Sequence, residues 1–177
     1  MDDLTLVNEC AKGNPRAQRV LFDKFAPKML MVCQRYMASI EEAEDVLQDG
    51  FVKIFQKIGE FKMEGSLEGW VRRIMVNTAL DALRKNKKLL GDVSVDDVSY
   101  KVSFQDHGFE AMDVAHLMRM IHDLPDGYRV VFNMFAIEGY SHKEIADILG
   151  VSENTSKSQY SRARAFLRNQ IEGKKSD

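Results

Sequence analysis

Residues 141–164 read SHKEIADILGVSENTSKSQYSRAR and carry the most specific local pattern in the chain. Ser141 and Glu144 form a capping box, in which the serine hydroxyl accepts from the backbone three residues on and the glutamate reaches back. Gly150 can adopt the left-handed conformation that ends a helix, and Ser152 can cap the next helix. Two short helices joined by a glycine-containing turn of three residues are typical of a helix-turn-helix motif.

The second helix of this motif, expected from Ser152 to about Ile171, has two different sides. A stripe at four-three-four spacing should pack inward; it consists of Ser156, Tyr160, Ala163 and Leu167. The opposite arc is polar, and its asparagine and arginine side chains can pair with base edges while lysine and serine contact phosphates. The DNA-reading surface predicted here comprises Ser152, Glu153, Asn154, Lys157, Ser158, Arg162 and Arg164. The alternative is a solvated face on an ordinary helical hairpin, but the capping box, the glycine turn and the polar start together favour DNA.

The composition of the whole chain fits a soluble globular protein of one domain or two small ones. It has 177 residues, of which 45% are hydrophobic and 29% charged. No run of 18 apolar residues occurs, so no membrane insertion is expected. The N-terminus is acidic and lacks the apolar segment of a secretory signal, and Cys10 and Cys33 are too few for a disulfide scaffold. These features predict a cytoplasmic protein.

The net charge of −2 hides a segregation of charge along the chain. Residues 41–68 hold eight acidic and three basic side chains, and residues 69–90 hold one acidic and six basic side chains. Residues 91–126 hold eight acidic and two basic side chains, and the bases return towards the C-terminus. Blocks of this kind indicate several different partner surfaces.

Helical periodicity dominates upstream of the motif and predicts an all-α protein. Helices are expected over 15–37, with Pro27 either kinking the helix or opening a second one, over 40–59 and over 67–88. Residues 89–110 show no helical period and form a predicted acidic linker, in which a short strand at Val93 and Val95 is a weak alternative. The predicted organisation is therefore two small helical domains, 1–88 and 111–177, joined by the linker 89–110. In the second domain, one helix is expected over about 111–123 and another from Pro125.

The helix over 40–59 begins at a capping box of Ser39 and Glu42 and is strongly amphipathic. Its polar arc carries Glu41, Asp45, Gln48 and Asp49. Such an arc is normally a solvated face, but it also suits docking to a basic helical partner. Periodicity alone leaves both interpretations open.

The helix over 67–88 has a basic stripe next to aromatic residues, which fits attraction to the nucleic-acid backbone and stacking of unpaired bases. The stripe carries Arg73, Asn77, Arg84 and Lys88, and the aromatic residues are Phe61 and Trp70. Trp70 is expected to serve the core more than stacking, because large aromatic side chains usually pack.

Signals of enzyme chemistry are absent from the sequence. The histidines, His107, His116, His122 and His142, have no metal-ligand spacing with one another or with the cysteines. Neither a P-loop, nor a G-x-S-x-G nor a Rossmann glycine pattern occurs. We therefore expect neither an enzyme nor a bound cofactor or metal, and the cysteines are expected to be buried thiols.

Three segments together resemble the extracytoplasmic-function (ECF) group of sigma factors in the sigma-70 family. EAEDVLQDGF at 42–51 resembles the group's D-A-E-D-x-x-Q-x-x-F, and GWVRRIMVNTALD at 69–81 resembles W-L-x-R-I-A-x-N-x-A-x-D. Leu124-Pro125, followed by residues 139–164, resembles L-P…E-G-x-S-x-x-E-I-A-x-x-L-G-V-S-E-x-T-V-K-S-R-x-x-R-A-R. The resemblance covers about residues 10–88 and 113–170.

The resemblance implies a promoter-specificity subunit that binds core RNA polymerase and promoter DNA and assists strand opening. The helix with Asp45, Gln48 and Asp49 would dock on the clamp coiled coil of the β′ subunit. The −10 element would be met by the loop at about 61–66, including Lys62, and by the helix from Arg73 to Arg84. The helix from Ser152 to Arg164 would read the −35 element near the β flap. The linker would thread towards the RNA exit path, and an anti-sigma factor is a further partner that the sequence alone leaves open.

Four residues depart from the group's pattern: Ser156 replaces a usual valine, Gln159 a common arginine, and Met75 and Val76 smaller or charged residues. They bear on promoter preference rather than on the class. The rival hypothesis is a stand-alone helix-turn-helix regulator whose first domain senses a signal or dimerises. It would bind a palindromic operator unaided and would not bind core polymerase.

Overall fold

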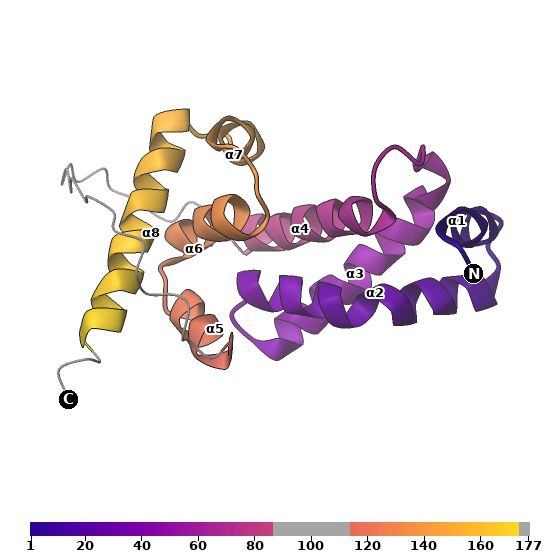
Figure 1. Cartoon of the computed structure of the whole chain (residues 1–177), viewed down its shortest axis with the longest axis horizontal. Coiled ribbons are helices and arrows are strands. Elements are labelled where there is room, and N and C mark those ends of the chain that lie inside the picture. Colours follow the sequence, from indigo (N-terminus) through magenta and orange to yellow (C-terminus); the bar gives the residue numbers. More distant parts are fainter. Residues whose placement is uncertain (87–113, 174–177) are drawn as a thin grey trace. The chain divides into compact units, whose positions relative to one another are not determined.

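The computed structural model describes residues 1–86 and 114–173, which fall into two compact units divided between Asn86 and Lys87 (Figure 1). In these two ranges every regular element is a helix, as the sequence predicts. The predicted linker 89–110, Lys88 and the weak strand at Val93 lie outside the described residues. No helix in the described ranges is both long enough and apolar enough to cross a membrane.

The first unit consists of four α-helices and one 3-10 turn. They are α1 (Asp3–Ala11), α2 (Pro15–Tyr36), α3 (Ile40–Lys57), η1 (Ile58–Glu60) and α4 (Leu67–Lys85). Each α-helix begins at a side chain that accepts from its first turn, and the caps are Asp2, Asn14, Ser39 and Ser66. In Figure 1, α2, α3 and α4 lie against one another, and α1 packs on α2 and η1.

Of the two predicted alternatives, Pro27 does not open a second helix, because α2 is a single helix from Pro15 to Tyr36 with Pro27 inside it. Pro27 lies on the exposed side of α2, where its ring costs no core packing. The predicted capping box of α3 differs in detail. Ser39 Oγ accepts from Glu42 N at 3.1 Å, but the Glu42 carboxylate accepts from Ala38 N at 3.1 Å, one residue before the cap.

The contact between α3 and α4 depends on a glycine. Gly50 lies on the buried side of α3 and Met75 on the fully buried side of α4. A Cβ added at Gly50 would overlap the Met75 Sδ and Cε atoms. Gly50 therefore makes room for the longer Met75 side chain, which explains how this departure from the group's pattern is accommodated.

In the second unit, residues 114–173 form four α-helices and one π-helical turn. They are α5 (Val114–His122), α6 (Asp126–Phe132), η2 (Asn133–Ile137), α7 (His142–Leu149) and α8 (Glu153–Gly173). The predicted capping box of α7 is confirmed: Glu144 N donates to Ser141 Oγ at 3.1 Å, and Ser141 N donates to the Glu144 carboxylate at 2.8 Å. Gly150 ends α7 with φ +68°, the left-handed conformation expected of it. Buried apolar side chains from α5, α6, α8 and the turn between α5 and α6 form the core, among them Met120, Ile121, Leu124, Phe132, Ala163 and Leu167.

Buried Arg129 fixes the end of α5 against α6. Its Nη2 donates to the carbonyl oxygens of His122 at 2.9 Å and Leu124 at 2.8 Å, and its Nη1 lies 3.4 Å from the Asp126 carboxylate. A cation at the C-terminus of a helix is favourable because the last carbonyls carry partial negative charge. Arg129 thus ties the end of α5 and the following turn to α6.

Candidate polymerase and nucleic-acid interfaces

The acidic face of α3, defined by Glu41, Asp45, Gln48 and Asp49, is exposed along its whole length. No ion pair neutralises its three carboxylates within the part of the chain that the structure describes. Exposed Glu44 adds a further negative charge. Val52 lies one turn beyond Gln48 on the same face and is 54% exposed. Val52 was not predicted, since a single apolar residue on a polar arc has no distinctive pattern.

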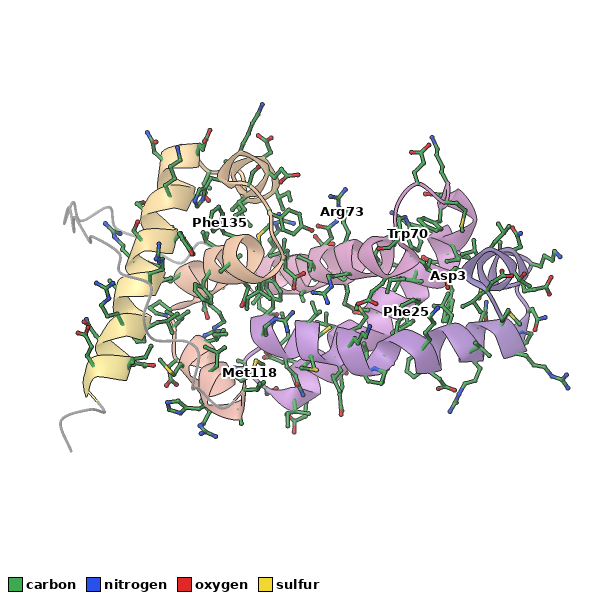
Figure 2. All side chains as sticks on the ribbon, viewed as in Figure 1. Asp3, Phe25, Trp70, Arg73, Met118 and Phe135 are labelled. Carbon is green, nitrogen blue, oxygen red and sulfur yellow. The ribbon has the colours of Figure 1, made fainter. Side chains whose placement is uncertain are left out.

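The predicted basic stripe of α4 is exposed at Arg73, Asn77 and Arg84, and Figure 2 labels Arg73. Asp81 is exposed beside it. The charges of the stripe are not equivalent. The Asp81 carboxylate lies 3.3 Å from Lys53 Nζ of α3 and 3.1 Å from Arg84 Nη1, so Arg84 is partly neutralised. Arg73 and Asn77 are exposed and have no such partner among the described residues. Lys88, the last predicted member of the stripe, lies outside the described residues.

Phe61, in the loop before α4, and Trp70, in α4, pack against each other and do not form an open surface on which bases could stack. Phe61 is only 8% exposed and packs on half-buried Trp70 with ring centroids 5.4 Å apart, and Figure 2 shows Trp70 beside the loop. Lys62 is exposed, as predicted. Met63 is also exposed and has φ +59°, a conformation that costs a non-glycine residue free energy and is concentrated at functional sites. Nothing in the sequence indicated the strained Met63.

The turn between α7 and α8 is compact. Val151 N donates to Ala146 O at 3.1 Å, and the small buried Ala146 lets α7 approach α8. Ser152 Oγ accepts from Thr155 N at 3.0 Å and so caps α8 as predicted. The direction of α8 is therefore fixed at its first turn.

The outer side of α8 carries the predicted DNA-reading residues, but with unequal exposure. Ser152, Glu153, Asn154, Lys157 and Ser158 are exposed. Arg162 and Arg164 are half-buried, and the Arg164 guanidinium lies 5.4 Å from the centroid of the Tyr160 ring, a cation–π contact. Ser161 is exposed on the same side. It was not among the predicted DNA-reading residues, which included its neighbours Ser158 and Arg162.

The inner side of α8 meets a layer of polar and aromatic groups. His142 stacks on Phe135 with ring centroids 4.1 Å apart, and its Nδ1 lies 2.9 Å from Ser156 Oγ. Figure 2 labels Phe135, which also contacts Tyr160 of α8 at 4.6 Å between centroids. Burial and nearby Lys157 lower the pKa of His142, opposed by the Glu153 charge. Ser156 thus uses its hydroxyl where the group's usual valine could only pack.

Neither cysteine is placed for reaction. Cys10 and Cys33 are free and buried, and burial raises the pKa of both thiols, that of Cys33 to about 12. Both therefore remain protonated and unreactive at neutral pH. In residues 1–86 and 114–173, no group of three histidine, cysteine or acidic side chains could hold a metal ion.

Two helical units, the second ending in a capped helix-turn-helix with a polar outer face, define a class of DNA-binding protein. Residues 21–89 match the family model of sigma-70 region 2, and residues 116–167 match that of sigma-70 region 4. The chain belongs to the sigma-70 family, in its ECF group.

Relatives across bacteria agree with this assignment. The chain is 27% identical to the RNA polymerase sigma-H factor of Pseudomonas aeruginosa, covering 93% of this chain and 91% of that protein. It is 28% identical to the ECF RNA polymerase sigma-E factor of Haemophilus influenzae, covering 97% of this chain and 96% of the relative. It is 26% identical to the ECF RNA polymerase sigma factor SigW of Bacillus subtilis, covering 93% and 94%.

Solved structures share the fold. CnrH, in complex with the cytosolic domain of CnrY, matches with a TM-score of 0.54 and 24% identity over 97% of each chain. The sigma factor RpoE of Bartonella quintana, in complex with the anti-sigma factor NepR, matches with a TM-score of 0.55 and 23% identity over 86% of this chain and 94% of that one.

The family assignment defines the activity at the level of its class. The chain directs promoter-specific initiation of transcription with core RNA polymerase, and both polymerase and promoter DNA are its partners. Sigma factors are DNA-binding initiation factors rather than catalysts in themselves. The match to region 2 does not favour a stand-alone regulator, because that hypothesis requires only the C-terminal unit.

Proposed function

We propose that the acidic face of α3 binds the clamp coiled coil of the β′ subunit and so attaches the chain to core polymerase. Its carboxylates are exposed and carry no ion pair among the described residues. The acidic face therefore has no such ion pair to break when a basic partner helix binds it. Complementary charge also accelerates the encounter. Val52 adds an apolar contact at the centre of the polar arc.

The same unit would meet the −10 element through the loop 61–66 and α4. Exposed Lys62, Arg73 and Asn77 can attract the phosphate backbone and contact unpaired bases. Unstacking a base costs a few kcal/mol, and its capture on the protein offsets that cost during strand opening. Because Phe61 is buried, we assign it to packing beneath Trp70 rather than to direct stacking.

The second unit would read the −35 element with the outer side of α8 and dock near the β flap. This proposal places the domains at 1–88 and 111–177, with the linker 89–110 carrying the acidic charge that keeps it off DNA. The protein would work in the cytoplasm and catalyse no reaction of its own. By extension from the sigma factor RpoE of Bartonella quintana, which was solved with the anti-sigma factor NepR, an anti-sigma factor would control it.

One observation carries the proposal: regions 2 and 4 occur in order on one chain, with an exposed acidic face on α3 in region 2 and a polar outer side on α8 in region 4. The test is run-off transcription with purified core polymerase on a library of genomic fragments, without any other sigma factor. We expect discrete transcripts that depend on the added chain. Absence of promoter-dependent product, together with no co-purification of the chain with core enzyme, would refute the proposal.

A further inference from the structure

The outer side of α8 offers fewer free side chains than its sequence suggests. Lys157 Nζ lies 3.3 Å from the Glu153 carboxylate, so these two charges are paired. Ser158 Oγ donates to Thr155 O at 3.0 Å, which occupies its proton. Arg164 lies over Tyr160, and Arg162 is half-buried at the edge of the arc. Most of these groups must rearrange before they can pair with a base.

Asn154 is the exception. It is exposed, it is the second residue of α8, and within residues 1–86 and 114–173 its side chain has no hydrogen-bond partner. The backbone that carries it is fixed by the Ser152 cap on Thr155 N and by Ser156 N donating to Ser152 O at 3.1 Å. In helix-turn-helix proteins the N-terminal residues of the second helix reach the base edges.

A carboxamide has one acceptor oxygen and one donor NH₂ side by side. In the major groove only adenine presents a complementary neighbouring pair, the N7 acceptor and the N6 donor. Guanine presents two acceptors, and cytosine and thymine each present one hydrogen-bonding group. We propose that Asn154 is a specificity-determining residue that reads an adenine in the −35 element, an inference that rests on the proposed function.

Lys157 provides the contrast. A lysine ammonium is a mobile point charge, and its release from Glu153 on DNA would serve a phosphate rather than a base. Loss of Lys157 should therefore weaken all promoters alike, whereas loss of Asn154 should erase a preference at one position. The two neighbouring substitutions form a matched pair on one exposed helical surface.

The experiment uses reconstituted holoenzyme and a set of promoters in which each −35 position carries each of the four bases. For wild-type chain, we expect one adenine position that depends on Asn154. Asn154→Ala should reduce discrimination there by about tenfold, within the range for a bidentate base contact, and leave other positions unchanged. Lys157→Ala should lower binding to every promoter and reduce the slope of log affinity against log salt by about one.

Replacing that adenine by 7-deazaadenine, which lacks the N7 acceptor, supplies a second test. Binding should weaken for wild type but not for Asn154→Ala, because the contact is already lost. Alanine is a good helix former at an exposed site, so the second unit should stay folded, and unchanged hydrogen exchange at the α8 amides would show it.

Three results would overturn the assignment: unchanged preferences in Asn154→Ala, a uniform loss across all promoters, or a lost preference for a base other than adenine. These differ from failure of the proposed function, in which wild-type chain itself would give no promoter-dependent transcript. That result would remove the inference as well.

Discussion

Helices α4 and α8 both present an exposed polar face, but they are held in different ways. The inner side of α4 is almost wholly apolar, with Leu67, Val71, Met75, Val76, Thr78, Ala79, Leu80 and Leu83 buried. The buried residues of α8 are Ser156, Gln159, Ala163 and Leu167, half of them polar. The side-chain oxygen of Gln159 has no hydrogen-bond partner among the described residues.

The two helices should therefore respond to different kinds of substitution. Close packing holds α4, so its position depends on volume and tolerates few changes in core size. Helix α8 packs through Ala163 and Leu167, but it is also held by the aromatic contacts of Tyr160 and by the contact of Ser156 with His142. Such contacts are directional, and the one with His142 responds to protonation. The first unit should therefore be sensitive to cavities, and the second to polar substitutions and pH.

The largest effect is expected at the seam between α3 and α4. Met75→Ala should lower the free energy of unfolding of the first unit by about 2–5 kcal/mol, because it removes a fully buried side chain and leaves a cavity. Trp70 is the only tryptophan and belongs to this unit, so its fluorescence during urea denaturation measures the change.

The matched variant at this seam is Gly50→Ala. In the wild-type background its methyl group overlaps Met75, whereas in the Met75→Ala background the space is free. There, Gly50→Ala should stabilise by about 0.5–1 kcal/mol through helix propensity. Equal effects in both backgrounds would show that the seam is not close-packed as described.

The next largest effect concerns the acidic face of α3. Reversing two charges with Asp45→Lys and Asp49→Lys together should weaken binding to core polymerase by about tenfold or more, since like charges would then meet across the interface. Both side chains are exposed, so the thermal stability should change little. Fluorescence anisotropy with labelled chain measures the affinity. Asp123→Lys, at an exposed acid of the second unit, is the control, and equal loss in the control would contradict the docking role.

A smaller effect is expected beneath α8. Ser156→Ala removes the 2.9 Å contact with His142 Nδ1 and should destabilise the second unit by about 1 kcal/mol. Hydrogen exchange at the α8 amides should quicken about fivefold. Ser158→Ala, on the exposed side, should have little effect. If the two serine variants behave alike, the polar layer does not orient α8.

The smallest effect is the pH dependence carried by His142. Because its pKa is lowered in the folded chain, the neutral ring is favoured there, while the unfolded chain takes up a proton near the ordinary pKa of 6.5. Stability of the second unit should be fully present above 6.5 and fall as the pH decreases through it towards the lower folded pKa. Thermal unfolding between about pH 5 and 8 should show this slope, and His142→Gln should flatten it. A slope of opposite sign would refute the burial of the neutral ring.

Much of the fold followed from local signals in the sequence. The start of α7 was predictable because Ser141 and Glu144 form both halves of a capping box, and its end because Gly150 takes positive φ. The exposed arcs of α3 and α4 followed from the helical period. By contrast, α1 was not predicted, although Asp2 caps it, since nine residues give too few turns for a clear period.

The candidate sites were less predictable where tertiary contacts determine how far a side chain is buried. The burial of Phe61 depends on Trp70, and the partial burial of Arg164 on Tyr160. The π-helical turn Asn133–Ile137, which leads towards α7, has no sequence signature in a single chain. The basic stripe of α4 could be predicted from the charges along the sequence. The ion pair between Lys53 of α3 and Asp81 of α4 could not, because it joins two helices whose contact depends on the fold.

The most direct test of the account is footprinting of one selected promoter with core polymerase, with the chain alone, and with both together. We predict that the complete holoenzyme protects both the −35 and −10 elements and makes the −10 bases reactive to a single-strand probe. The chain alone should protect neither, since its net charge is −2 and few phosphates are neutralised. Strong protection of a palindromic site by the chain alone, unchanged when core polymerase is added, would contradict the account.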